Sequence, residues 1–576
     1  MSLRPEEWPE IPEATARVAR AAAGRGAPPL AMRVRDELGG LFADAEFAEA
    51  FGRRGRRGWS PGRLAMVSVL QMAENLTDRA AVQRVRFDLS WKYCLGLDLG
   101  DVGFDASVLS EFRTRVVDHG LEERVLDLLL AALKEKGLVK AGGKQRTDST
   151  HVLAAVRELN RLELAGETVR AALEALSAAA PVWVAQVLEV GEWNRRYGRR
   201  IDAYWRPPGS QTQRDQLALD YGRDAVALLR AVYHPATPVW LRELPAVQTL
   251  RQITVQNYLI TTVGGREVVK RREADKDGLP PGRIRLTSPY DLDARYGTKE
   301  DLHWTGYKLH ISEVCQSPGP DDEAPRPGRR ARPTVPNMIT HVATTDATVP
   351  DVKLVEPVHQ ALADRGLLPA EHYLDSGYAS AELIVGAQAA FGITLVTPLL
   401  TGTSRQYREN AGYQREAFAI DWDARRATCP QGATSRFWSP AKQKGRDVIV
   451  VRFDQADCGP CPVRAECTNA TCWGRQLTLR PRPLHELIHA NHIAQEDQEW
   501  RAKYALRAGV EGTIRQAMAV TGNRRARYRG LGKTRLEHVY SAVALNLIRL
   551  DAWWNGQPLD HSRTSHLARL NLTLAA

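Results

Sequence analysis

The spacing of apolar residues predicts long helical stretches in the first half of the chain. From residue 31 to 143 apolar positions recur at helical intervals, and Ser60-Pro61 has the signature of an N-cap followed by a first-turn proline. Residues 1–30, rich in Ala, Pro and Arg, predict a flexible leader. Residues 157–275 return to helical patterning, which indicates a helical insertion.

Extended patterns predict a sheet built from segments on both sides of that insertion. Strands are expected at Lys144–Leu153, Gly306–Val314, Met338–Thr345, Glu371–Asp375 and Thr394–Pro398. Helices are expected at Pro350–Arg365 and from Ser380, and an exposed loop at Ser317–Asn337. Two hairpin strands followed by helix, strand, helix and strand predict a mixed α/β sheet with an antiparallel side.

The last third of the chain predicts a cysteine-rich insertion and a helical end. Residues 401–494 hold five of the seven cysteines, and residues 557–576 are expected to be a tail. Gln495–Val520 and His538–Trp553 predict two helices. The predicted α/β core is therefore interrupted, and comprises residues 144–156, 276–400 and 495–556.

Composition narrows the class of protein. Of 576 residues 43% are hydrophobic, which is enough for sizeable cores and argues against global disorder. Apolar runs fall far short of the roughly 20 residues that span a bilayer, and the N-terminus lacks a signal-peptide layout. We therefore expect a soluble, cytoplasmic protein. Its net charge of +11 favours a polyanionic partner.

Two carboxylates are expected at the strands of the core. Asp148 lies within one predicted strand and Asp375 ends another, before Ser376-Gly377. Aspartate is disfavoured in strands, so its presence at each of these positions needs an explanation. Taken alone, Asp148 could be a strand-end residue that bonds to local hydroxyls, and Asp375 could be an N-cap or a turn former.

A third carboxylate, Glu511, is harder to explain as a structural residue. Spacings of 3, 4, 4 and 3 place five side chains on one helical face: Tyr504, Arg507, Glu511, Arg515 and Met518. Gly509 and Gly512 flank the glutamate, and each costs a helix about 1 kcal/mol relative to alanine. An ion pair with the arginines would not explain the glycines, which indicate a close approach to the helix.

Three such carboxylates suit a pair of divalent cations. Two cations about 3.5–4 Å apart can activate a water or 3′-hydroxyl and stabilise the leaving oxygen in an attack on phosphorus. Hard oxygen ligands favour Mg²⁺ or Mn²⁺. This chemistry predicts two metal ions held by Asp148, Asp375 and Glu511.

The chain resembles bacterial insertion-sequence transposases of the DDE class, most closely the insertion sequence 1182 group, which is related to the insertion sequence 4 and 5 groups. The resemblance runs from about Leu41 to Trp554 and rests on these stretches: Thr-Asp-Ser-Thr-His at 147–151, Ser288-Pro289-Tyr290-Asp291, Ala294-Arg295-Tyr296, Gly306-Tyr307-Lys308, Asp-Ser-Gly-Tyr at 375–378, and the run from Tyr504 through Tyr528-Arg529-Gly530-Leu531 to Asn546.

The resemblance implies an RNase H-like catalytic core with Asp148, Asp375 and Glu511 as the metal-binding triad. The related insertion sequence 4 group has the signature Tyr-x2-Arg-x3-Glu-x6-Lys. The chain matches its first three positions, whereas the final Lys position holds Met518. Arg515, one turn from Glu511, is the candidate for the role of that lysine.

Basic residues gather around the third carboxylate. Residues 501–535 contain ten Lys or Arg and one acid, Glu511, a density that predicts a groove for DNA phosphates. Tyr528 would either stack on an unpaired base or pack on the core. Four arginines in residues 52–58 fit either a solvated loop or a phosphate-contacting arm. The expected DNA-binding residues are Tyr504, Arg507, Arg515, Arg524, Arg525, Arg527, Tyr528, Arg529 and Lys533.

The clustered cysteines predict either a structural zinc site or reduced thiols. They follow the pattern Cys429-x28-Cys458-x2-Cys461-x5-Cys467-x4-Cys472, with a Cys-Gly-Pro-Cys-Pro knuckle typical of tetrahedral zinc. The first four are the natural ligand set, although Cys472 leaves the choice ambiguous.

These features together predict a DNA transposase. It would bind the terminal inverted repeats of its element, cut the 3′ ends and join them to target DNA, as a homodimer on DNA. No Gly-x4-Gly-Lys-Ser/Thr loop suggests a need for ATP. A copy that binds DNA without cutting it, and an RNase H-like nuclease that only hydrolyses, are the alternatives.

Overall fold

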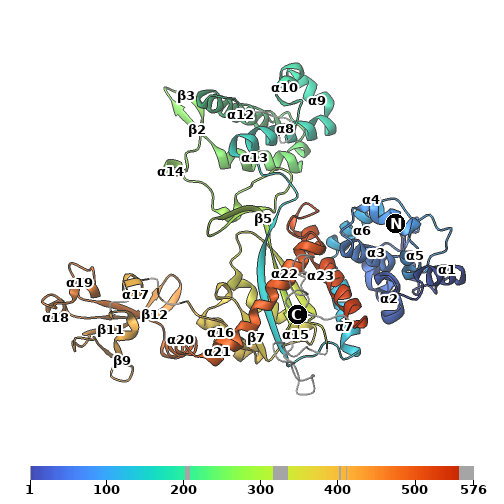
Figure 1. The fold of residues 1–576 in the computed structure, drawn as a ribbon. Helices are drawn as coiled ribbons and strands as arrows, with labels where there is room; N and C mark the ends of the chain where they lie inside the picture. The colour runs from blue at the N-terminus through green and yellow to red at the C-terminus, as the bar shows by residue number, and fades with distance from the viewer. Residues whose placement is uncertain are drawn as a thin grey trace, which may run out of the picture.

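A mixed six-stranded sheet lies at the centre of the protein (Figure 1). The computed structural model describes residues 2–201, 208–315, 335–400, 402, 404–409 and 412–556. The strands of the central sheet are β1 (Lys144–Leu153), β4 (Arg295–Lys299), β5 (Leu302–Val314), β6 (Ile339–Asp346), β7 (Glu371–Leu374) and β8 (Thr394–Val396). The predicted mixed α/β class is confirmed.

Strand β1 separates an antiparallel side of the sheet from a parallel side. The long strand β5 runs antiparallel to β1, and its other edge pairs first with β4 and then with β6. On the far side β7 is parallel to β1, and β8 is parallel to β7. Gly306 has a φ of 153° in β5, and a Cβ there would overlap the carbonyl of Val152 on β1. This sheet is consistent with an RNase H-like core.

Helices from two parts of the chain surround the sheet, and several of them pack on its strands. The first group follows β6 and β7: η4 (Asp351–Leu354), α15 (Val355–Asp364), η5 (Ser376–Tyr378) and α16 (Ala381–Phe391). The second group comes from the end of the chain: α20 (Arg482–Ala494), α21 (Gln498–Tyr504), η7 (Ala505–Ala508), α22 (Gly509–Val520) and α23 (Leu531–Trp554). Helix α22 contacts β1 and β5, and α23 contacts β6. The predicted single helix over 495–520 is thus three shorter ones.

The N-terminal helices share one apolar core with the sheet. They are α1 (Glu13–Ala23), α2 (Leu30–Leu38), η1 (Asp44–Ala50), α3 (Pro61–Ala73), α4 (Asp78–Phe87), α5 (Leu89–Leu95), α6 (Ser107–Asp118) and α7 (Arg124–Glu135). Helices α2, α3, α6 and α7 all contact α23, and one buried cluster runs from Ala31 through the sheet to Leu550. The expected flexible leader is wrong in part, because α1 packs on α5 and buries Thr15 and Ala19.

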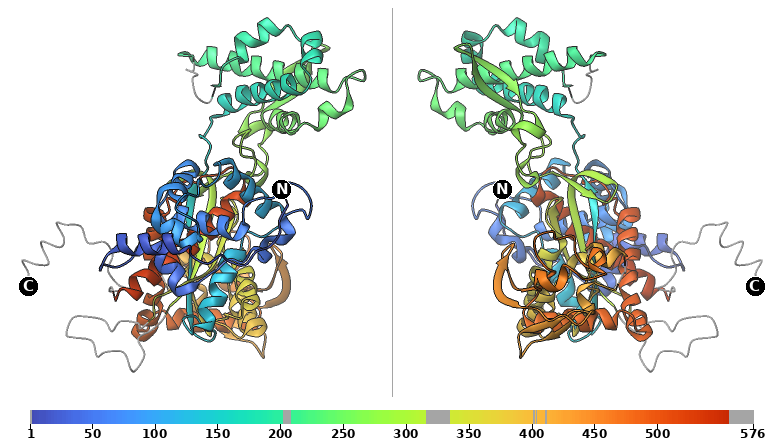
Figure 2. Two further views of the ribbon diagram at one scale, coloured as in Figure 1. Left: turned by 90° about the vertical axis from the view of Figure 1, so that its right-hand side faces the viewer. Right: turned by 90° about the vertical axis from the view of Figure 1, so that its left-hand side faces the viewer.

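A helical lobe stands apart from the sheet, above the ends of β1 and β5 (Figures 1 and 2). It contains α8 (Arg161–Ala179), α9 (Pro181–Val187), α10 (Val190–Tyr197), α12 (Gln211–Val232), η2 (Val239–Glu243), α13 (Pro245–Asn257), the hairpin of β2 (Tyr258–Val263) and β3 (Arg266–Arg271), and α14 (Ala274–Asp277), with η3 (Gly282–Ile284) on the way back to the sheet. A separate apolar cluster, including Val169, Leu176 and Leu228, fills its interior. The hairpin was not predicted.

A small β lobe carries the clustered cysteines, at the opposite side of the sheet from the N-terminal helices (Figure 1). Its elements are α17 (Arg405–Glu409), η6 (Arg415–Ala417), β9 (Ala419–Asp421), β10 (Arg426–Thr428), β11 (Phe437–Gln443), β12 (Arg446–Arg452), α18 (Gln455–Cys458), α19 (Arg464–Cys467) and β13 (Gln476–Leu479). Its core includes Phe418, Val451 and Leu479.

Two predicted segments fall outside the described residues. Most of the loop expected at Ser317–Asn337 and the whole tail at 557–576 belong to them. Within the parts that the structure does describe, no helix has the length and apolar character needed to cross a membrane.

Candidate active site

The pairing of β1 with β7 brings the first two predicted carboxylates together. Thr147 on β1 lies opposite Leu374 on β7, so one step further along this parallel pair places Asp148 beside Asp375. Neighbouring strands are about 4.8 Å apart, and side chains directly opposite each other point to the same face. Electrostatic coupling agrees with this placement, because Asp375 raises the pKa of Asp148.

Asp375 sits where β7 gives way to a tight turn. Its Oδ1 accepts hydrogen bonds from the Gly377 backbone N–H at 2.7 Å and the Ser376 hydroxyl at 3.0 Å. The turn-forming role considered from the sequence is therefore present. It uses Oδ1, and the described residues donate no hydrogen bond to Oδ2.

Arg507 joins the first and third predicted carboxylates. Its Nη1 lies 2.9 Å from Asp148 Oδ2, a residue 359 positions away, and its Nη2 lies 2.5 Å from Glu511 Oε1. Glu511 presents its side chain to solvent, with 56% of it exposed, whereas the Asp148 side chain is 11% exposed. Arg507 thus bonds to two of the three predicted carboxylates, and the third, Asp375, lies beside Asp148 on the neighbouring strand.

Burial and charge act in opposite directions at this site. Burial raises the pKa of Asp148, while the Ser149 backbone N–H and the Arg507 cation oppose that rise. Burial lowers the pKa of Arg507, but the carboxylates of Asp148 and Glu511 outweigh it, so that its pKa is raised overall. The Arg507 cation therefore offsets part of the cost of burying the charge on Asp148.

The donor set fits hard divalent cations, although the ligands are not gathered for one. No group of three or more His, Cys, Asp or Glu side chains in the described ranges is arranged to hold a metal ion. Asp148 and Glu511 instead share the Arg507 cation. Carboxylate oxygens are the ligands that Mg²⁺ and Mn²⁺ prefer, so Asp148, Asp375 and Glu511 would hold such ions once Arg507 withdraws.

A fourth carboxylate, Asp351, lies against the same site. Its Oδ2 accepts a hydrogen bond from Ser149 at 2.9 Å, and its Oδ1 receives Lys308 Nζ at 2.8 Å. A Cβ on Gly377 would lie 3.7 Å from both Asp351 Oδ2 and Asp375 Oδ1. Asp351 is not among the site residues predicted above, and its position shortly after β6 is the only signal for it in the sequence.

The two glycines beside Glu511 have different surroundings. A Cβ on Gly509 would overlap the guanidinium of Arg146, which reaches the helix from β1. A Cβ on Gly512 would meet nothing within 4 Å. The predicted close approach is therefore confirmed at Gly509 and wrong at Gly512.

Some of the predicted DNA-binding residues are exposed, and one of them, Arg515, lies one helical turn from Glu511. The exposed members are Arg515, Arg525 and Arg529, and Lys533 is half-buried. Arg525 lies beside the end of β1, because the backbone N–H of its neighbour Ala526 donates a hydrogen bond of 2.8 Å to the carbonyl of Leu153. Tyr504 stacks on Trp500, with ring centroids 5.1 Å apart.

Other members of that set hold the protein together. Arg524 donates to the carbonyl of His151 at 2.9 Å, and Arg527 donates to the carbonyl of Leu76 at 2.6 Å. The Arg113 guanidinium lies 4.3 Å from the centre of the Tyr528 ring. That contact agrees with the packed alternative for Tyr528 rather than base stacking.

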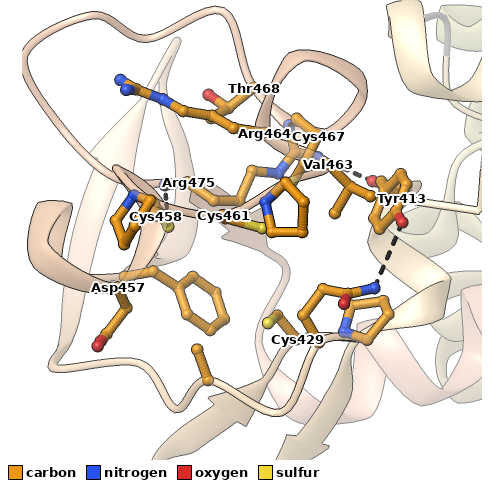
Figure 3. A pocket seen from close by; sticks show the side chains of 16 residues that line it. Tyr413, Cys429, Asp457, Cys458, Cys461, Val463, Arg464, Cys467, Thr468 and Arg475 are labelled. Carbon is orange, nitrogen blue, oxygen red and sulfur yellow. Dashed lines mark hydrogen bonds between the residues drawn. The ribbon is translucent and has the colours of Figure 1, made fainter.

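Four cysteines line one cavity of about 250 Å³ in the β lobe (Figure 3). They are Cys429, Cys458, Cys461 and Cys467, the set favoured from the sequence. Burial raises the pKa of Cys467, and the other three thiols add to that rise, which shows how close the four lie. Cys472 is exposed and does not line the cavity.

Two parts of the chain match known families. Residues 428–551 match the model described as "Transposase DDE domain", and residues 25–115 match that described as "Transposase domain (DUF772)". The first match includes Glu511 and the basic residues around it, and the second covers helices α2 to α5 and most of α6. No curated protein matches the chain.

Both matched segments are transposase domains, so together with the fold they support a transposase, and this kind of domain suggests DNA as a partner. More particularly, they support an insertion-sequence transposase of the DDE class. The DDE domain match suggests an enzyme that cuts DNA.

Proposed function

We propose that this protein moves an insertion sequence by cutting DNA at the element's terminal inverted repeats and joining the 3′ ends to target DNA. The observation that carries this proposal is the approach of Asp148 to Asp375 on one side and to Glu511, through Arg507, on the other. The Arg507–Glu511 pair is local, but the neighbours of Asp148 come from parts of the chain more than 200 residues away. A purely structural ion pair would need only one of the three.

Within this proposal the three carboxylates hold two Mg²⁺ or Mn²⁺ ions. When bound, the ions would activate the attacking oxygen and stabilise the leaving oxygen at phosphorus. Asp148 is fixed by its strand and Asp375 by its turn, so these two define one side of the site. Glu511 is more exposed and closes the site from α22. Arg507 pairs with Asp148 and Glu511, and it would have to withdraw for these carboxylates to hold metal ions.

The exposed cations provide the surface for DNA. Arg515, Arg525, Arg529 and Lys533 lie on α22, on the loop beside the end of β1 and at the start of α23. Cations in these positions would neutralise phosphates on either side of the scissile bond. Arg524, Arg527 and Tyr528 shape the same loop from within.

The finer assignments go beyond the family matches. We place the chain in the insertion sequence 1182 group, and assign end recognition and pairing of two protomers to the N-terminal helical region 31–143, which holds α2 to α7. These helices share an apolar core with the sheet. A DNA end bound to them would therefore be held in a fixed relation to the carboxylates.

Incubation with a labelled element end tests the function. With Mg²⁺ and a target duplex, we expect both nicked ends and joined products. A duplex with a scrambled end sequence is the control and should yield neither product at the same protein concentration. Nicks without joined products would indicate the hydrolysing nuclease instead, and binding without nicks would indicate a DNA-binding protein.

We also propose that Cys429, Cys458, Cys461 and Cys467 hold a structural zinc ion. Four thiolates are a usual tetrahedral set for zinc, and the Cys458-to-Cys461 segment has the knuckle spacing. The backbone N–H of Arg475 lies 3.4 Å from Cys458 Sγ, a contact that stabilises a thiolate. The four side chains line one cavity but are not gathered about a common centre, so zinc binding would require them to turn inward.

Zinc content of cysteine variants tests this site. The wild-type protein is expected to carry one zinc per chain, and Cys461→Ser should lower zinc affinity at least tenfold because one of four ligands is lost. Cys472→Ser is the matched control and should keep its zinc. Metal analysis after dialysis measures both. A wild-type zinc content well below one per chain would favour ordinary reduced thiols.

A further inference from the structure

A buried carboxylate, Glu313, lies behind the candidate active site and takes no part in the proposed chemistry. It belongs to β5, directly opposite Arg146 on β1, and its side chain is 0% exposed. A charge removed from water needs several partners to remain charged. The hydrogen-bond partners of Glu313 therefore identify the elements that it holds in place.

Three elements donate to this one carboxylate. Arg146 Nε of β1 lies 2.7 Å from Oε1, while the Thr513 hydroxyl of α22 and Arg549 Nη1 of α23 lie 2.5 and 2.9 Å from Oε2. Arg549 Nη2 also donates to the Thr513 hydroxyl at 2.5 Å. Both carboxylate oxygens are thus bonded, and the network joins the sheet to two helices.

Two of these donors are close in sequence to catalytic candidates. Arg146 precedes Asp148 by two residues on β1, so both side chains point to the same face of the sheet. Thr513 follows Glu511 by two residues on α22, which turns them to different sides of the helix. Thr513 is buried against the sheet, and Glu511 therefore faces outward.

Arg146 also reaches the segment that leads into α22. Its Nη1 donates to the carbonyl of Leu506 at 2.7 Å, and its guanidinium fills the space that a Cβ on Gly509 would need. Glu313 orients this guanidinium through Oε1. The start of α22 therefore rests on a side chain that Glu313 holds.

We propose that Glu313 is a positioning residue that sets the spacing between Asp148 and Glu511, acting through Arg146 and Thr513. This inference rests on the proposed function, because it concerns the same carboxylates. Glu313 itself touches neither metal nor DNA in this account. Its role is to fix the distance between α22 and β1, so that Asp148 and Glu511 can bind the same cations.

Variants on both sides of the network test the inference. Glu313→Gln removes the charge, and Gly509→Ala displaces Arg146 while Glu313 stays intact. Each is expected to weaken Mn²⁺ binding at least tenfold, measured with Mn²⁺ alone by electron paramagnetic resonance, and to raise the Mn²⁺ concentration for half-maximal end cleavage by a similar factor. Binding of the element end should stay within twofold. Gly512→Ala is the matched control and should behave as wild type.

The outcomes separate this inference from the proposed function. Should Glu313→Gln fail to fold, Gly509→Ala and Thr513→Val carry the test. Wild-type Mn²⁺ affinity in a folded Gly509→Ala protein would overturn the positioning role and leave the transposase proposal intact. A wild-type protein that binds no Mn²⁺ would overturn the proposed function and this inference with it.

Discussion

Changing Asp148 or Asp375 to Asn, or Glu511 to Gln, is expected to slow end cleavage by roughly 1,000-fold, which corresponds to about 4 kcal/mol of transition-state stabilisation. Each amide keeps the shape of the side chain but lacks the charge that holds a divalent cation. Binding of the element end should persist, because the exposed arginines and Lys533 are unchanged. Single-turnover cleavage of a labelled end, with a parallel binding titration, measures both effects.

An exposed carboxylate provides the control for these three variants. Asp364 ends α15, away from the turn at Asp375, and accepts a hydrogen bond from Gln360 at 2.8 Å. Asp364→Asn should therefore cleave at the wild-type rate. If any one of the three triad variants cut DNA as fast as wild type, that residue would have to be removed from the proposed metal site.

Five of the six strands of the central sheet could be predicted because they follow local rules, whereas β4 was missed. The predicted strand at Lys144–Leu153 has the bounds that the structure gives to β1, and those at β6, β7 and β8 agree within two residues. Their short runs of β-branched and aromatic residues, separated by turns and helices, carry that signal. The hairpin of β2 and β3 carried a similar signal, since Gly264-Gly265 separates two extended runs, and could have been found.

The contacts that shape the site could not be predicted, because the partners are far apart in sequence. Residues 495–520 have helical periodicity throughout, yet the helix is interrupted at Ala505–Ala508, where the carbonyl of Leu506 accepts a hydrogen bond from Arg146, 360 positions away. Likewise, the sequence predicted a DNA contact for Arg507, whereas its guanidinium pairs with Asp148. Contacts between residues so far apart in the sequence are known only once the fold is known.

The same limitation applies to a buried acid on α23, Glu537. Its periodic position in an apolar helix gave no reason to single it out. In the structure it is 0% exposed, with Oε2 accepting the backbone N–H of Arg527 at 2.8 Å and Oε1 without a partner among the described residues. Burial raises its pKa to about 7, against smaller opposing effects from Arg527, Arg113 and the backbone of Tyr528. Glu537 thereby anchors the basic loop to the core.

That raised pKa predicts a stability that falls as the pH rises. The folded protein keeps the proton on Glu537 up to about pH 7, while the unfolded chain releases it near the ordinary value of 4.5. Stability is therefore lost between these values, by about 3 kcal/mol in total. Glu537→Gln removes this dependence, so the wild-type minus variant difference in unfolding free energy should shift by about 3 kcal/mol between pH 4.5 and 8. Urea unfolding at several pH values measures it, and the exposed Glu356→Gln should show a difference that stays within about 0.5 kcal/mol. A constant difference for Glu537→Gln would mean that the buried carboxyl is charged throughout this range.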